Sequence, residues 1–230
     1  MKISIMQPTY LPWLGYFELI DRSDTFVFFD DVQFEPKSWH QRNRLKGPNG
    51  EQMLTVPVLT AGKRYQKICE AEIDNKQQWA VKHIRSIEFN YSKTPFFNNY
   101  IKPLKEIYEK EWVKLVDLNL ALVSFLMGQL KITTPVICSS ALKIESSDDR
   151  RVIDICKKLG AEELYDAAGA RALLNLGLFQ EEGIRLTFQD YKHPAYRQLH
   201  GSFIPYLSVI DLLFNEGERS LEIIRSGGGN

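Results

Sequence analysis

Two adjacent aspartates, Asp30 and Asp31, follow a run of apolar residues, TFVFF at positions 25–29. Adjacent side chains on an extended backbone point to opposite faces, so one carboxylate can face a cleft while the other closes a turn. A carboxylate in a cleft can act as a general base, or bind an ammonium group, a ribose hydroxyl or Mg²⁺. We therefore take Asp30 as a candidate catalytic base, with a solvated strand end as the structural alternative. Gln33, close behind, is a candidate for substrate binding.

A basic segment, KSWHQRNRLK at residues 37–46, carries a second set of candidate side chains. On a strand, Arg42, Arg44 and Lys46 share one face, while Asn43 lies on the other. Guanidinium groups offer paired donors that match phosphate and carboxylate oxygens, so we take the two arginines and the asparagine as candidates for substrate binding. A solvated basic hairpin, which resists aggregation, is the alternative.

A third group of polar residues lies on and just after a helix predicted at residues 76–91. His83 is the second candidate base, and Lys82 beside it is a candidate for substrate binding. Tyr91 and Lys93 complete the candidate substrate-binding set. A histidine packed on a helix face is the structural alternative for His83. The histidines and cysteines of the chain show no metal-ligand spacing, so we expect no metal site.

An aromatic stretch, MQPTYLPWLGYF at residues 6–17, occupies the place of a short polar strand–helix loop. Its prolines restrict the backbone and so lower the entropy cost of holding the aromatic rings. We expect Gln7 and Tyr10 to face a pocket and to bind substrate. We expect Trp13 and Tyr16 to pack in the wall of that pocket.

Hydrophobic patterning predicts the elements that position these residues. Strands are expected at residues 2–6 and 25–29, joined by a brief helix at 17–22, which makes a parallel βαβ unit. The turn GPNG at 47–50 predicts a hairpin of residues 42–46 and 52–58. Further elements are helices at 76–91, 103–130 and 149–159, strands at 133–138 and 184–189, and helices at 207–215 and 217–225.

The predicted fold class is α/β. An N-terminal parallel sheet with a β-hairpin is followed by a mostly helical C-terminal half that packs on it. We expect residues 1–230 to form one compact domain, with a division into lobes 1–130 and 131–225 as the alternative. Parallel strands end on the same edge of a sheet, where open α/β proteins bind ligands, so we expect the site at the ends of the first two strands.

Composition excludes several classes of protein. The 230 residues carry no net charge, which argues against electrostatic attraction to nucleic acid or to an anionic membrane. No apolar run reaches the roughly 20 residues that a membrane span requires. The N-terminus lacks the pattern of a signal peptide, and three widely spaced cysteines are typical of a reducing compartment. We therefore expect a cytoplasmic protein without a membrane span.

Several stretches together form a specific pattern. They are ISIMQPTYLPWLGYF (3–17), DDVQF (30–34), RNRLK (42–46), LTVPV (54–58), WAVKHIRSIEFNYSKTPFF (79–97) and YLSVIDLLFNEG (206–217). In these stretches the chain resembles the WbqC-like family, over about residues 2–217. The segment YDAAGA (165–170) departs from the Y-x-S-G pattern of that family because Ala168 precedes the glycine. Either a hydroxyl is dispensable there, or this chain differs in substrate.

The resemblance implies a role in bacterial O-antigen or related surface-polysaccharide biosynthesis, as a glycine transferase that acylates an amino sugar. We therefore expect an enzyme, an aminoacyl or acyl transferase that acts on the amino group of a nucleotide-linked sugar. For such a substrate we expect Arg42, Arg44 and Lys82 to bind the diphosphate, and Gln7 and Asn43 to orient the acceptor. The acyl donor is open between free glycine with ATP and magnesium, an aminoacyl-tRNA and a thioester.

Two other functions remain as alternatives. One is a non-catalytic nucleotide-sugar-binding or scaffold protein of the same pathway, which would bind saturably without turnover. The other is a tRNA- or RNA-binding module that uses the basic hairpin, for which the neutral net charge is unfavourable. The sequence leaves the oligomeric state open.

Overall fold

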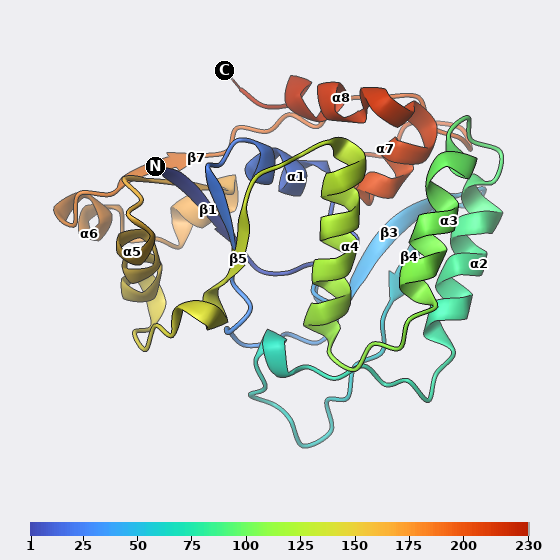
Figure 1. Ribbon diagram of the computed structural model, residues 1–230. Coiled ribbons are helices and arrows are strands. Elements are labelled where there is room, and N and C mark those ends of the chain that lie inside the picture. Colours follow the sequence, from blue (N-terminus) through green and yellow to red (C-terminus); the bar gives the residue numbers. More distant parts are fainter. Residues whose placement is uncertain (230) are drawn as a thin grey trace.

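The computed structural model describes residues 1–229, and its centre is one sheet of five parallel strands in the order β5-β2-β1-β6-β7 (Figure 1). The strands are β1 (Lys2–Met6), β2 (Thr25–Phe28), β5 (Val136–Cys138), β6 (Glu163–Asp166) and β7 (Arg185–Phe188). The chain builds outward from β1 to β5 and then returns to the other side of β1. The strand order therefore reverses between β1 and β6, and ligands of open α/β sheets bind beside such a point.

Helices and a separate hairpin surround this sheet. The hairpin consists of β3 (Arg42–Gly47) and β4 (Gly50–Thr55). The α-helices are α1 (Leu14–Asp21), α2 (Trp79–Tyr91), α3 (Phe97–Tyr108), α4 (Leu115–Leu130), α5 (Asp148–Leu159), α6 (Leu176–Glu181), α7 (Val209–Glu216) and α8 (Ser220–Ser226). Short 3₁₀ turns are η1 (Ile68–Glu70), η2 (Ser139–Leu142), η3 (Ala168–Ala172) and η4 (Gly217–Arg219). No helix of residues 1–229 has the length and apolar character needed to cross a membrane.

The core lies on both faces of the sheet. Phe26 and Phe28 of β2 point into a large cluster with α1 and α4, whereas Val27 between them points into a smaller cluster with α5 and α6. Each of these side chains is almost fully buried, which contributes about 1.5–3 kcal/mol per residue. The large cluster continues into the hairpin and α2, α3 and α7, so the same core supports both the sheet and the hairpin.

The prediction of a mixed α/β fold is confirmed. β1 and β2 pair in parallel, with Ile3 opposite Thr25 and Met6 opposite Phe28, and GPNG does form the hairpin turn. The strand at Glu163–Asp166 was not predicted, because its short segment ELYD lacks a longer apolar run. The C-terminal half contains helices, as expected, and it also supplies β5, β6 and β7 to the common sheet.

The single helix predicted at residues 103–130 is wrong, because the structure has two helices there. Residues 109–114 break the pattern, since their backbone pairs with a neighbouring segment instead. Ile73 donates its amide to the Val113 carbonyl at 2.9 Å, and an isolated bridge joins Glu72 to Lys114. α3 starts at Phe97, so Pro103 lies in the second turn of that helix. The prediction had placed Pro103 in the first turn of a helix.

Candidate functional site

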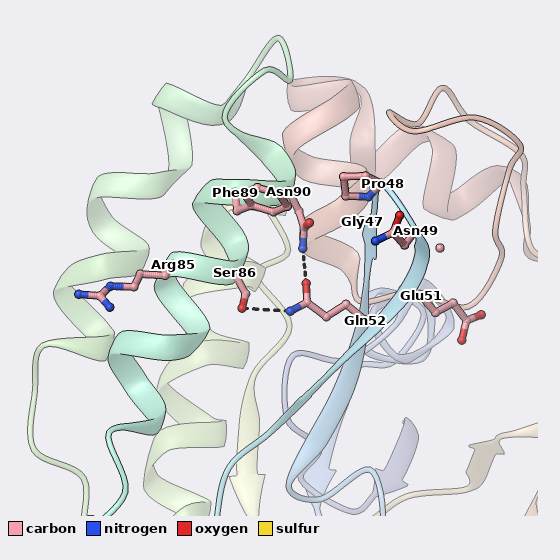
Figure 2. A pocket seen from close by; sticks show the side chains of 10 residues that line it. Gly47, Pro48, Asn49, Glu51, Gln52, Arg85, Ser86, Phe89 and Asn90 are labelled. Carbon is pink, nitrogen blue, oxygen red and sulfur yellow. Dashed lines mark hydrogen bonds between the residues drawn. The ribbon is translucent and has the colours of Figure 1, made fainter.

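Two clefts adjoin the hairpin. The first, of about 460 Å³, lies between the hairpin tip, residues 47–52, and four residues of α2 (Figure 2). Its polar side chains are linked to one another, because Gln52 Nε2 donates to Ser86 Oγ at 3.2 Å and Asn90 Nδ2 donates to Gln52 Oε1 at 2.6 Å. None of the residues predicted to bind substrate lines this cleft.

The second cleft lies at the carboxyl end of β1, where the sequence predicts a site, and we call it the aromatic cleft. Its lining residues are Met6, Thr9, Pro12, Trp13, Tyr16, Trp39, Asn43, Arg44 and Tyr206. They come from the β1–α1 loop, from Trp39 and β3, and from the segment before α7. The volume of about 270 Å³ is just below the usual range of roughly 300–1,000 Å³ for small-molecule sites, so it suits a single ring better than a whole nucleotide sugar.

Asn43 holds the β1–α1 loop in place. Its Nδ2 donates to the carbonyls of Tyr10 at 3.2 Å and Leu11 at 2.7 Å. Leu11 itself adopts a left-handed φ of 45°. The Pro12 carbonyl accepts from the amide of Val209 at 2.9 Å. The loop is thus tied to β3 on one side and to α7 on the other, which makes the cleft rigid.

Trp13 is fixed in the wall by its neighbours. Its indole lies against Gly15, where an added Cβ would come within 2.2 Å of the ring. The rings of Tyr191, His193 and Tyr206 surround the indole at centroid distances of 5.5, 6.2 and 5.4 Å. Gly15 therefore serves to make room for Trp13.

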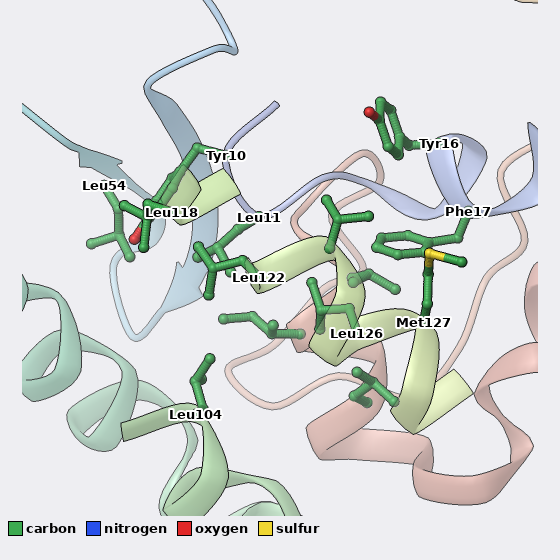
Figure 3. Packing of buried hydrophobic residues seen from close by; sticks show 14 of the residues in the cluster. Tyr10, Leu11, Tyr16, Phe17, Leu54, Leu104, Leu118, Leu122, Leu126 and Met127 are labelled. Carbon is green, nitrogen blue, oxygen red and sulfur yellow. The ribbon is translucent and has the colours of Figure 1, made fainter. Parts of the chain in front are cut away.

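One of the side chains expected to face the pocket, Tyr10, needs correction. Trp13 and Tyr16 line the aromatic cleft, whereas Tyr10 is fully buried. Figure 3 shows Tyr10 beside Leu54 and far from Tyr16. The hydroxyl of Tyr10 finds its partners in the core, where it lies 2.8 Å from Nδ1 of His83 and also contacts the Tyr108 hydroxyl.

His83, one of the two candidate bases, belongs to this buried group. Its side chain is only 5% exposed, and desolvation lowers its pKa to about 4. The imidazole is therefore neutral at pH 7, and it stacks edge-on against Trp79 with a centroid distance of 5.5 Å. His83 does not line the aromatic cleft.

Asp30, the other candidate base, lies at the carboxyl end of β2. Its Oδ1 accepts from Ser139 Oγ at 3.1 Å and from the Ser140 amide at 2.9 Å, and its Oδ2 accepts from Ser140 Oγ at 2.7 Å. Asp31 pairs with Arg151 of α5 and also accepts a hydrogen bond from Ser139 Oγ. The two aspartates therefore share Ser139 as a partner, and Asp30, which is buried and does not line the aromatic cleft, joins the ends of β2 and β5.

Gln7 is exposed and oriented at the end of β1. His40 Nε2 donates to Gln7 Oε1 at 2.9 Å, because the other ring nitrogen, Nδ1, accepts from the amide of Glu35 at 3.4 Å. Burial lowers the pKa of His40 to about 4, so this neutral tautomer persists at pH 7. Gln7 does not line the aromatic cleft, but its backbone carbonyl accepts a hydrogen bond at 3.1 Å from the hydroxyl of Tyr16, a residue of the cleft wall.

The basic face of β3 is divided between two tasks. Arg44 Nη1 donates to both carboxylate oxygens of Glu51 at 3.0 Å, and its Nη2 donates to the Tyr206 carbonyl at 3.0 Å. Arg42 lies over the Trp39 ring, 5.9 Å from its centroid, and within residues 1–229 neither its buried Nε nor that of Arg44 has a hydrogen-bond partner. Arg44 thus holds the cleft wall through its terminal nitrogens, whereas no ion pair of the described residues includes Arg42.

Lys46, which we had not included among the site candidates, anchors the segment of residues 189–208 between β7 and α7. Its Nζ donates to Gln198 Oε1 at 3.1 Å and to the carbonyls of Gly201 and Ser202 at 3.3 and 2.6 Å. Desolvation lowers its pKa, while buried Asp211 opposes that shift. In the sequence, only the RNRLK pattern draws attention to Lys46. Its anchoring role could not be predicted, because the residues that it binds lie far along the chain.

The remaining candidates lie outside the aromatic cleft. Lys82 and Lys93 are exposed on and after α2, and Tyr91 is buried, where its hydroxyl accepts from the Lys46 amide at 2.9 Å. Gln33 Nε2 donates to the Arg64 carbonyl at 3.3 Å. The fold therefore brings Asn43 and Arg44 into the cleft, with Gln7 and Arg42 beside it. The cleft residues that we had not predicted to bind substrate include Trp39, Tyr206 and Thr9.

Comparison with known proteins gives a family and one close relative. The model of a family described as "WbqC-like protein family" matches residues 7–223. The chain is 37% identical over 226 residues to "Uncharacterized protein Rv1507c" of Mycobacterium tuberculosis (strain ATCC 25618 / H37Rv), and the match covers 97% of each chain. No solved structure matches the chain.

Proposed function

Since the chain belongs to the WbqC-like protein family, we propose that it transfers an aminoacyl or acyl group, with glycine as the leading candidate, to the amino group of a nucleotide-linked sugar. The pathway that we propose is bacterial surface-polysaccharide (O-antigen) biosynthesis. The observation that carries the proposal is the aromatic cleft at the carboxyl end of β1. It combines ring-stacking walls with arginines at one side, as a sugar joined to a diphosphate requires.

The sugar ring is proposed to occupy the cleft between Trp13 and Trp39. Aromatic faces pack against the apolar face of a sugar, and their burial excludes water from the reacting groups. The Gln7 amide, held by His40, is positioned to contact a hydroxyl or the amino group of the ring. Asn43 stabilises the wall of the cleft by donating hydrogen bonds to the Tyr10 and Leu11 carbonyls.

The reaction forms an amide bond between the sugar nitrogen and the acyl carbon, and breaks the bond between that carbon and its leaving group. The ammonium group of the sugar must first lose a proton to a base. Of the two candidate bases we take Asp30, because its strand end adjoins that of Gln7, whereas His83 lies beside Tyr10 in the core. Both side chains are buried and neither lines the aromatic cleft, so the assignment of Asp30 rests on its place at the sheet edge. The donor is proposed to arrive activated, as an adenylate formed with ATP, an aminoacyl-tRNA or a thioester.

Mass spectrometry of the acceptor tests this proposal directly. Purified protein is incubated with UDP- and dTDP-linked amino sugars and with each donor system in turn: glycine with ATP and magnesium, glycyl-tRNA, and glycyl thioester. We expect one acceptor to gain the mass of one glycyl or acyl group. An unchanged acceptor with every donor, together with saturable sugar-nucleotide binding, would favour the non-catalytic binding protein instead.

A further inference from the structure

Three cations, Arg42, Arg44 and Lys82, are the predicted ligands of the diphosphate, and their surroundings distinguish them. Arg44 already has one carboxylate and one carbonyl as partners, from Glu51 and Tyr206. Lys82 is exposed on α2 and does not line the aromatic cleft. Arg42 remains, and among the ion pairs of residues 1–229 none reaches its guanidinium.

We propose that Arg42 is the phosphate-binding residue of this site and holds a phosphoryl group of the ligand whose ring fills the aromatic cleft. This inference rests on the proposed function in one respect, namely that the ligand is a nucleotide-linked sugar. It assigns the anion to one side chain, and it leaves Arg44 the separate task of holding the cleft wall.

The position of Arg42 supports the assignment. Trp39 lines the cleft and is 47% exposed, and the Arg42 and Arg44 guanidinium carbons lie 5.9 and 5.4 Å from its ring centroid. A ligand that leaves the cleft over Trp39 therefore meets both guanidinium groups, and Arg42 is the one without an ion-pair partner among residues 1–229. Stacking on the indole orients the planar guanidinium and lowers the entropy cost of a bidentate contact with phosphate.

The electrostatics favour an anion at this point. Buried donors without acceptors are costly, and Arg42 Nε, like Arg44 Nε, is a buried donor with no partner within residues 1–229. Of these two arginines, Arg42 alone also lacks an ion pair among the described residues, because Arg44 is paired with Glu51. A phosphoryl oxygen supplies both the missing acceptor and the compensating charge. The neighbouring Glu51 does not compete for Arg42, since its two oxygens are already bound to Arg44.

Calorimetric titration of wild type and Arg42→Gln with UDP, dTDP and their amino-sugar conjugates tests the assignment. We expect the variant to bind the phosphorylated probes about 10- to 100-fold more weakly, the effect of losing one hydrogen bond to a charged group. Free amino sugar should bind both proteins equally. Arg42→Lys, which keeps the charge without the paired donors, should give an intermediate loss.

Arg85→Gln serves as the matched control, because Arg85 lines the hairpin-tip cleft and should leave every affinity unchanged. Wild type that binds none of the phosphorylated probes, or a variant that loses affinity for free amino sugar to the same extent, would overturn the assignment. The test measures binding, so it is separate from the proposed function. If Arg42→Gln acylated the sugar with an unchanged KM, the phosphate role of Arg42 alone would be refuted. If binding depended on Arg42 but no acylation occurred, the proposed transferase activity alone would be refuted.

Discussion

At the scale of single residues, the shape of the aromatic cleft depends on glycine at position 15, which has no side chain. Gly15 lies in the first turn of α1, where its backbone needs no left-handed φ, so alanine fits the helix itself. The constraint is the indole of Trp13, which occupies the place of a Cβ. Tyr191, His193 and Tyr206 enclose that indole elsewhere, so a displaced ring must move toward the cleft.

Gly15→Ala is therefore expected to narrow the cleft without touching the ligand. Sugar-nucleotide affinity should fall at least tenfold, because the ring has no other direction in which to move. Gly128→Ala, an exposed helical position on α4 with open space around its Cα, is the control and should bind normally. Equal affinities in the two variants, measured by calorimetry, would show that Trp13 does not define the cleft.

The buried imidazole of His83 gives a second prediction at this scale. Its pKa is about 4 in the fold, against 6.5 in the unfolded chain, so acid favours the unfolded chain, which takes up the proton. The stability due to His83 is thus complete above pH 6.5 and is lost as pH falls toward 4. We expect the advantage of wild type over His83→Gln to shrink by about 2 kcal/mol between pH 7 and pH 5.

Urea unfolding of both proteins at the two pH values measures this change. Other titrating groups contribute equally to wild type and variant and cancel in the difference. A gap in unfolding free energy that stays constant with pH would contradict the burial of a neutral histidine.

At the scale of elements, the hairpin fastens the segment of residues 189–208 across the site. Arg44 binds its Tyr206 carbonyl, and Lys46 binds Gln198, Gly201 and Ser202, so two residues of one strand face hold a long stretch without helix or strand. Because Tyr206 lines the aromatic cleft, this fastening also sets one wall of the site.

Lys46→Met is expected to loosen that wall. The change leaves the Gly201 and Ser202 carbonyls without their donor and Asp211 without a neighbouring cation, which together cost about 1–3 kcal/mol of stability. Hydrogen exchange should rise in residues 198–206 and remain unchanged in α5. Lys158→Met is the control, since Lys158 also donates to a backbone carbonyl, that of Leu142. If hydrogen exchange in Lys46→Met changed to the same extent in residues 198–206 as in the rest of the chain, the anchoring role would be refuted.

Sequence patterns predicted the parts of the site that depend on local order. The parallel pairing of β1 with β2, the GPNG turn and the common edge of Gln7 and Asp30 all follow from short-range signals. The burial of Tyr10 could not be predicted, because the partners of its hydroxyl are His83 and Tyr108, far along the chain. Similarly, no local signal indicates that Lys46 binds residues 198–202 and not a ligand.

At the scale of the whole molecule, one sheet unites the two halves of the chain. β1 pairs with β2 on one side and with β6 on the other, and the strand order reverses between β1 and β6. The long insertion between β2 and β5 carries the hairpin and α2 to α4, and Figure 1 shows these elements gathered on one side of the sheet. The aromatic cleft lies where the insertion meets the end of β1.

A structure of the protein bound to a UDP- or dTDP-linked amino sugar tests the central claim most directly. We predict that the sugar ring lies against Trp13 and Trp39 in the aromatic cleft, with a phosphoryl group at Arg42 and the Gln7 amide beside the ring. A ligand bound in the hairpin-tip cleft beside Asn90, with the aromatic cleft unchanged and empty, would contradict it.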